Sequence, residues 1–243
     1  MLAAEDKSIM DIDPQKINPE RKQASYGTSW HYETLPRQTK KALDFLSKEE
    51  WLKQSSWYLA GGTALALQAG HRKSVDLDFF SEDKNFNEKK LLANFAENSN
   101  LEIEVEEKNT IYAKLFGAKV SFIAYPFFVP KQKPLWHGTI RVLDQIDIGV
   151  MKITAISQRG RKRDFFDLYW CAHNVEPLEN IIKRLKVQYP MVAHDYHHIL
   201  KSMVYFEDAE SDPEPEICFP ADWKKVKKFF TKEIPLIATK IMK

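Results

Sequence analysis

Apolar and polar positions change their spacing near the middle of the chain, from short strand-like runs to helical repeats. In the first half, short runs with alternating or continuous apolar residues predict strands between amphipathic helices. We expect these strands at 57–60, 75–80, 101–107, 110–116, 118–125 and 139–143. We expect the intervening helices at 37–53, 63–69 and 86–98. The pattern therefore predicts an α/β (α+β) core with a mixed sheet flanked by helices.

From Asp144 onward, apolar residues recur at the three- and four-residue spacing of helices that bury one face. The expected helices cover 147–157, 164–173, 179–187, 194–206 and 223–230. The polar N-terminal region shows no such period and contains Pro14 and Pro19. We therefore predict an arm at 1–34, a core at 35–143 and a helical domain at 144–243.

Composition narrows the class of protein only slightly. The chain has 243 residues, 44% of them hydrophobic and 29% charged, which is typical of a globular protein. Its net charge of +2 does not by itself indicate nucleic-acid binding. The two cysteines lie far apart, without a zinc-binding pattern. Neither a secretory signal nor a transmembrane stretch is evident, so we expect a cytoplasmic protein without a membrane partner.

Asp76 and Asp78 are the first candidates for chemistry. Residues two apart in a strand face the same side, about 7 Å apart along the chain. Two such carboxylates raise each other's pKa, and a bound Mg²⁺ (or Mn²⁺) would remove that conflict. The alternative, for an Asp-x-Asp pair taken alone, is an acidic strand end in solvent.

The pair Gly61–Gly62 breaks the strand before these acids and opens a helix. Glycine lets the backbone approach a ligand, and a helix N-terminus attracts phosphate. Thr63 is the expected N-cap of this helix and Gly70 its expected left-handed end. A tight turn without a ligand would use the same residues. Glycine turn and carboxylate pair together are what phosphoryl or nucleotidyl transfer requires.

A third segment places Lys152 in an otherwise apolar helix, followed by a basic turn that contains Arg159. Basic side chains at such a turn suit triphosphate or an RNA backbone. Asp164 is expected to cap the next helix, near whose start Asp167 also lies. Arg72 can pair with the acidic residues or contact a nucleotide. The alternative for the turn is a solvated basic loop.

The runs LAGGTALALQAGHRKSVDLDFF from Leu59 and KITAISQRGRKRDFFDLYW from Lys152 resemble the nucleotidyltransferase AbiEii/AbiGii toxin family. The segment 203–210, followed by two prolines, is similar to a C-terminal signature of that family. The resemblance covers residues 35 to 230 approximately. It implies a minimal nucleotidyltransferase fold of the polymerase-beta type, and a toxin that is often encoded beside a cognate antitoxin.

Residue by residue, the resemblance assigns phosphate binding to Gly61, Gly62 and Thr63. It assigns the metal to Asp76 and Asp78, a phosphate contact to Lys152, and the later acidic position to Asp164. We add Arg159 as a second residue that neutralises the triphosphate. The expected reaction moves a nucleoside monophosphate from an NTP to a hydroxyl of tRNA or protein, with Mg²⁺ or Mn²⁺ as cofactor.

Ser121 departs from the family pattern, because polymerase-beta-type sites usually place a third carboxylate at this position. Glu104 or Glu106 on a neighbouring predicted strand can substitute, or the site can work with two carboxylates. Two other functions remain open. One is a non-catalytic module that binds a nucleotide or a partner, and the other is an adenylyltransferase for small molecules.

Overall fold

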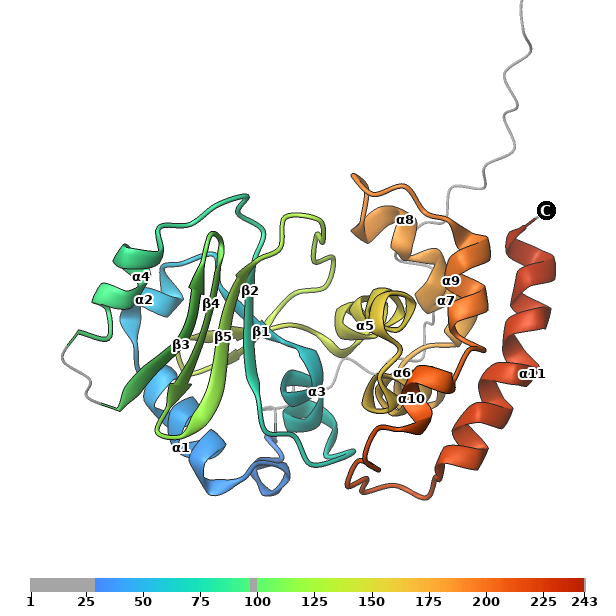
Figure 1. Ribbon diagram of the computed structural model, residues 1–243, viewed down its shortest axis with the longest axis horizontal. Coiled ribbons are helices and arrows are strands. Elements are labelled where there is room, and N and C mark those ends of the chain that lie inside the picture. Colours follow the sequence, from blue (N-terminus) through green and yellow to red (C-terminus); the bar gives the residue numbers. More distant parts are fainter. Residues whose placement is uncertain (1–28, 97–99, 243) are drawn as a thin grey trace, which may run out of the picture.

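A computed structural model of the protein describes residues 29–96 and 100–242 (Figure 1). In these ranges the structure contains a seven-stranded sheet with the order β3-β4-β5-β2-β1-β7-β6. The strands are β1 (Tyr58–Ala60), β2 (Leu77–Ser81), β3 (Leu101–Glu107), β4 (Thr110–Leu115), β5 (Ala118–Ala124), β6 (Leu135–His137) and β7 (Ile140–Val142). Strand β2 is parallel to β5 but antiparallel to β1, and β1 is parallel to β7. The mixed sheet, with an antiparallel extension through β4 and β3, confirms the predicted fold class.

One face of the sheet is apolar and covered by helices of the first half. Leu77 and Phe79 on β2 are fully buried, and the Phe79 ring stacks on Phe122 of β5 at a centroid distance of 5.1 Å. Trp51 and Phe95 pack against the same Phe122 ring. Trp51 belongs to one of the covering helices, which are α1 (Arg37–Leu46), α2 (Glu50–Lys53) and α4 (Glu88–Ala93). Alternation along β2 therefore leaves Asp78 on the opposite face.

Several predicted boundaries in the first half are wrong by a few residues. The helix expected at 37–53 is two helices, separated by a turn at Ser47. Strand β2 begins at Leu77, so Asp76 lies just before the strand rather than in it. Strand β6 was not expected. It forms a hairpin with β7 around Gly138, whose φ is +59°.

Helix α3 (Gly61–Ala69) lies between the sheet and the helical half of the molecule (Figure 1). It begins at Gly61, directly after β1, with Ala60 at the N-cap position. The expected N-cap role of Thr63 is therefore wrong, because Thr63 already lies in the first turn. Gly70 ends the helix with φ +64°, which confirms the predicted left-handed end.

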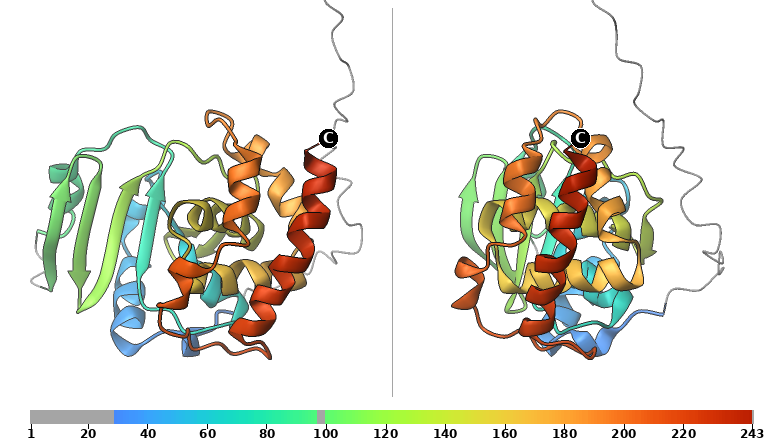
Figure 2. Two further views of the ribbon diagram at one scale, coloured as in Figure 1. Left: turned by 45° about the vertical axis from the view of Figure 1, so that its right-hand side comes forward. Right: turned by 90° about the vertical axis from the view of Figure 1, so that its right-hand side faces the viewer.

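The second half is helical, as predicted, and packs beside the sheet (Figure 1). Its helices are α5 (Gln145–Arg159), α6 (Lys162–Asn174), α7 (Leu178–Lys183), α8 (Leu185–Gln188), α9 (Tyr196–Ser202), α10 (Glu207–Glu210) and α11 (Trp223–Ile241). Helix α11 lies on the outer side of this half (Figure 2). It continues through Pro235 well beyond the predicted end at Phe230.

The predicted boundary between 143 and 144 falls where the chain passes from the last strand, β7, to α5. Most of the arm predicted at 1–34 lies outside the described residues. Its end packs on the core, because Thr34 is buried and the His31 N–H donates to the Leu67 carbonyl. Within the described ranges, no helix combines the length and apolar content needed to cross a bilayer.

Candidate active site

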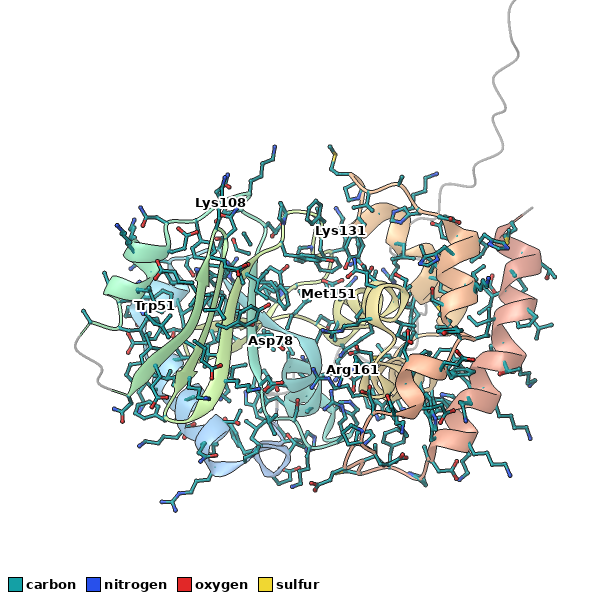
Figure 3. All side chains as sticks on the ribbon, viewed as in Figure 1. Trp51, Asp78, Lys108, Lys131, Met151 and Arg161 are labelled. Carbon is teal, nitrogen blue, oxygen red and sulfur yellow. The ribbon has the colours of Figure 1, made fainter. Side chains whose placement is uncertain are left out.

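A cleft of about 530 Å³ lies between the polar face of the sheet and α5. Asp78, from the sheet, and Met151, from α5, both line it and lie near the centre of the molecule (Figure 3). The predicted site residues that line the cleft are Gly61, Gly62, Arg72, Asp76, Asp78, Lys152 and Arg159. Thr63 and Asp164 are not among the lining residues. The structure thus brings together seven of the nine predicted positions.

Asp78 is held on β2 beside Ser121 of β5, its partner in the parallel register. The Ser121 hydroxyl donates to Asp78 Oδ1 at 2.8 Å. Burial raises the pKa of Asp78, and the neighbouring Asp76 raises it further, whereas the Ser121 hydrogen bond lowers it. The carboxylate therefore lies where a cation would be stabilised.

Asp76 enters the cleft from the turn that precedes β2. The buried Thr63 hydroxyl donates to the Asp76 backbone carbonyl and lies 2.8 Å from Ser74 Oγ, which fixes this turn against α3. Arg163 Nη1 approaches Asp76 Oδ2 at 3.6 Å. The Thr63 side chain therefore positions Asp76. Only the backbone N–H of Thr63 remains for the predicted contact with phosphate.

The glycine turn lies against Asp78. Gly61 has φ +71°, which favours glycine, and a Cβ added there would lie 3.2 Å from Asp78 Oδ2. No side chain of the N-cap residue Ala60 accepts from the first turn of α3. Gly61 and Gly62 line the same cleft as Asp76 and Asp78, so this helix start lies beside the carboxylates, as a phosphate site requires.

Arg72 fills the space behind the turn. It donates to both oxygens of Asp167, from Nε at 2.6 Å and from Nη2 at 2.9 Å. A Cβ on Gly62 would lie only 2.1 Å from Arg72 Nη2. Of the two roles predicted for Arg72, the structure shows an acidic partner, but that partner is Asp167 and not Asp76 or Asp78.

Lys152 reaches the floor of the cleft from α5. Its ammonium lies 2.6 Å from Asp164 Oδ1 and 2.6 Å from Asp167 Oδ2. Burial lowers its pKa, but the two carboxylates outweigh burial and raise the pKa above the ordinary value. Lys152 is therefore positively charged at neutral pH. Its ammonium has three N–H donors, and the two carboxylates account for two of them.

Asp164 is fully buried and binds Lys152 on one side and the half-exposed Arg159 on the other. Helix α6 begins at Lys162, whose backbone N–H donates to Asp212 Oδ2 at 2.9 Å, and Asp164 lies inside the first turn, so the predicted capping role of Asp164 is wrong. Its carboxylate reaches the cleft only through the two basic residues. The geometry makes Asp164 a positioning residue rather than one that touches substrate.

Asp167 was not predicted as a site residue, although it is the centre of the buried ionic network. It accepts from Arg72, Lys152 and His71 Nε2, the last at 2.8 Å. Burial lowers the pKa of His71 and keeps it neutral at pH 7. A sequence signal existed, because positions 164 and 167 share one face of a helix that is otherwise apolar on that side.

Glu104 and Glu106 cannot supply the missing third carboxylate to the Asp76–Asp78 pair. Both lie on β3, and β4 and β5 separate this strand from β2. Three strand spacings amount to about 14 Å. Glu104 lines the far end of the cleft and pairs with Lys114 at 2.5 Å. The expectation that Glu104 or Glu106 replaces the third carboxylate is therefore wrong. Their strand, β3, is close to β2 in the sequence but is not its neighbour in the sheet.

In the described part of the chain, no three His, Cys, Asp or Glu side chains gather as a metal cluster. Two carboxylates nevertheless fit Mg²⁺, which commonly binds one or two protein carboxylates together with waters and substrate phosphates. Asp78 supports this fit, because burial and Asp76 both disfavour its charged form and raise its pKa, and a bound cation would remove that cost.

Comparison with known proteins agrees with this geometry. Residues 44–126 and 120–241 match the family model described as "Nucleotidyl transferase AbiEii toxin, Type IV TA system". An uncharacterized protein of Aquifex aeolicus is 34% identical over 187 residues, which cover 74% of this chain and 87% of that protein.

Two solved structures are similar in fold. JHP933 from Helicobacter pylori is 20% identical with a TM-score of 0.52, over 86% of this chain and 95% of that one. MenT4, a nucleotidyltransferase toxin from Mycobacterium tuberculosis, is 18% identical with a TM-score of 0.46, over 84% and 89% of the two chains. At 20% identity the likeness to JHP933 concerns the fold alone.

Proposed function

The chain belongs to the nucleotidyl transferase AbiEii toxin family of type IV toxin–antitoxin systems, and we propose that it is an active, Mg²⁺-dependent enzyme. The proposed reaction moves a nucleoside monophosphate from an NTP to a hydroxyl group of tRNA or of a protein. Mn²⁺ is the alternative cofactor, and a cognate antitoxin is the expected partner.

One observation carries the proposal. A glycine turn at the start of a helix without a side-chain cap lines the same cleft as two neighbouring carboxylates, Asp76 and Asp78. The backbone N–H groups at the helix start can donate to phosphate oxygens, and the two carboxylates can act as ligands of a divalent cation. Basic side chains complete the cleft on the α5 and α6 side.

Each residue has a distinct part in this arrangement. Asp76 and Asp78 would hold the cation, which when bound neutralises phosphate charge and aligns the reacting oxygens. Lys152 and Arg163 face the cleft as cations for the triphosphate, and Arg159 extends the basic wall. Electrostatic stabilisation of this kind provides most of the catalysis in phosphoryl-type transfer.

The proposed chemical step is a displacement at the α-phosphorus of the NTP. The acceptor hydroxyl oxygen bonds to the α-phosphorus, and the bond from this phosphorus to the oxygen that bridges to the β-phosphorus breaks. Pyrophosphate leaves, and the hydroxyl proton passes to water in the cleft, because Ser121 offers no carboxylate to accept it.

The test incubates the full chain with each α-³²P-labelled NTP, Mg²⁺ and either total tRNA or a protein extract. We expect label in one acceptor class, abolished by EDTA and by Asp76→Asn or Asp78→Asn. Glu106→Gln is the matched control, because Glu106 is an exposed acid outside the cleft. Unchanged incorporation in both aspartate variants would overturn the metal assignment. Label on a small molecule only would identify a different acceptor class.

A non-catalytic binding module is the second candidate, and the Ser121 hydrogen bond to Asp78 favours it. In that case the protein would bind NTP with Mg²⁺ and incorporate no label with any acceptor. Equilibrium dialysis with the same labelled NTPs separates the two functions, because it detects binding without turnover.

A further inference from the structure

A second hollow of about 430 Å³ opens beside the cleft, and we propose that it binds the nucleobase of the NTP. This inference rests on the proposed function. We call it the aromatic hollow, and its main lining residues are Tyr125, Phe127, Gln158, Tyr189, His194 and His198. Three of them, Tyr125, Gln158 and Tyr189, also line the cleft, so the two spaces adjoin. The volume is within the usual range for small-molecule sites.

A row of aromatic rings leads from the acidic pair to the aromatic hollow. Phe80 lies on the same face of β2 as Asp78, about 7 Å further along the strand. Its ring centroid is 5.7 Å from that of Tyr125, and the Tyr125 centroid is 5.7 Å from that of Phe127. A nucleotide with its α-phosphate at Asp78 can therefore lay its ribose along Phe80 and its base beyond Tyr125.

The cleft and the aromatic hollow differ in charge, and the triphosphate and the base of an NTP differ in the same way. The cleft carries five cations and three acids, which suit a triphosphate with its metal ion: Arg72, Lys119, Lys152, Arg159 and Arg163 against Asp76, Asp78 and Glu104. Among the described residues that line the aromatic hollow there is no lysine or arginine, and Asp195 is the one carboxylate. Such a space repels phosphate but accommodates a flat, uncharged base.

Phe127 offers the stacking surface. The residue is 51% exposed although it lines a hollow, and its ring and that of Tyr125 are arranged edge to face at an interplanar angle of 76°. Half of the residue is therefore accessible to a ligand in the hollow. Stacking of a base on an aromatic side chain changes affinity by about five- to 150-fold.

Gln158 provides polar recognition at the boundary between the two spaces. Its side chain is exposed on α5, and within the described residues its amide has no hydrogen-bond partner. The amide thus has donors and an acceptor free for a base edge. His198 lines the same hollow and donates from Nε2 to the Ser157 carbonyl at 3.2 Å, which holds its ring beside Gln158.

The experiment measures the dissociation constants of the four NTPs and of inorganic tripolyphosphate for the full chain with Mg²⁺ by calorimetry. We expect Phe127→Ala to weaken the preferred NTP about five- to 150-fold and to leave tripolyphosphate unchanged, and Phe127→Tyr to restore NTP affinity. Gln158→Ala should reduce the affinity difference between the best and the worst NTP. Trp136→Ala is the matched control, because Trp136 is 46% exposed and lines neither space.

The outcomes separate this inference from the proposed function. Equal loss for NTP and tripolyphosphate, or unchanged NTP affinity, in Phe127→Ala would overturn the nucleobase site. A raised KM for the acceptor with unchanged NTP affinity would assign the hollow to the acceptor and also overturn it. A wild-type protein that binds tripolyphosphate and all four NTPs equally would exclude the nucleobase site alone. A wild-type protein that binds no NTP would overturn the proposed function.

Discussion

Removing the charge of Asp167 should destabilise the protein strongly. The buried network contains two carboxylates, Asp164 and Asp167, and two cations, Lys152 and Arg72, all less than a tenth exposed. Asp167→Asn leaves two cations against one carboxylate, while the neutral His71 adds no compensating charge. Breaking a buried ion pair in this way costs about 3–5 kcal/mol, a large part of the stability of a typical domain.

The assay is urea unfolding at pH 7 of the wild type, Asp167→Asn and the control Glu179→Gln. Glu179 also accepts from two lysines, Lys183 and Lys240, but at the surface, so its loss should stay below about 1 kcal/mol. A loss below about 1 kcal/mol for Asp167→Asn as well would refute the reasoning, since the network would then contribute no more than a surface pair.

The same residue predicts a pH dependence. Burial would raise the pKa of Asp167, but Arg72 and Lys152 hold it well below the ordinary value. A carboxyl group with a depressed folded pKa stabilises the fold above its unfolded pKa, about 3.9, and this stability is lost as the pH falls below that value. Between pH 4 and 2 the wild type should therefore lose stability more steeply than Asp167→Asn, as measured by urea unfolding; equal slopes would contradict the assignment.

Three further predictions concern the cleft. Gly62→Ala should displace Arg72 from Asp167 and lower the unfolding free energy by about 2 kcal/mol, whereas the control Gly149→Ala, whose Cβ would meet no atom closer than 3.6 Å, should change it by less than 1 kcal/mol. Equal values for the two variants in urea unfolding would contradict the packing argument. Ser121→Asp places a carboxylate beside Asp78, so it should lower the melting temperature in EDTA and increase the rise caused by Mg²⁺; an unchanged response to Mg²⁺ would argue against a metal at Asp78. Arg163→Ala removes a half-exposed cation from the cleft and should weaken NTP binding about tenfold in calorimetry with no change in melting temperature; a large fall in melting temperature would show a structural role instead.

The parts of the site that depend on local sequence could be predicted. Asp76 and Asp78 are two residues apart, and Gly61–Gly62 marks a turn whatever surrounds it. The family resemblance placed Ser121 where such sites carry a third carboxylate, and the pairing of β2 with β5 puts it beside Asp78. Each of these features is decided by spacing within one element or by one strand pairing.

The roles of Thr63 and Asp164 could not be predicted, because local capping rules competed with tertiary packing. Both helices begin two residues earlier than expected, which moves these side chains into the first turn and buries them. The network around Asp167 joins segments about 80 to 95 residues apart in the chain. Nothing in the local pattern of any one segment indicates which other segment will face it.

The central claim is that Asp76 and Asp78 hold the metal that positions an NTP against the glycine turn. A crystal structure with Mn²⁺ and a non-hydrolysable NTP tests it most directly, because Mn²⁺ gives an anomalous signal. We predict an anomalous peak bonded to carboxylate oxygens of both residues, with phosphate oxygens at the N–H groups of Gly61 and Gly62. A peak at any other residues, or a triphosphate bound away from this turn, would contradict the account.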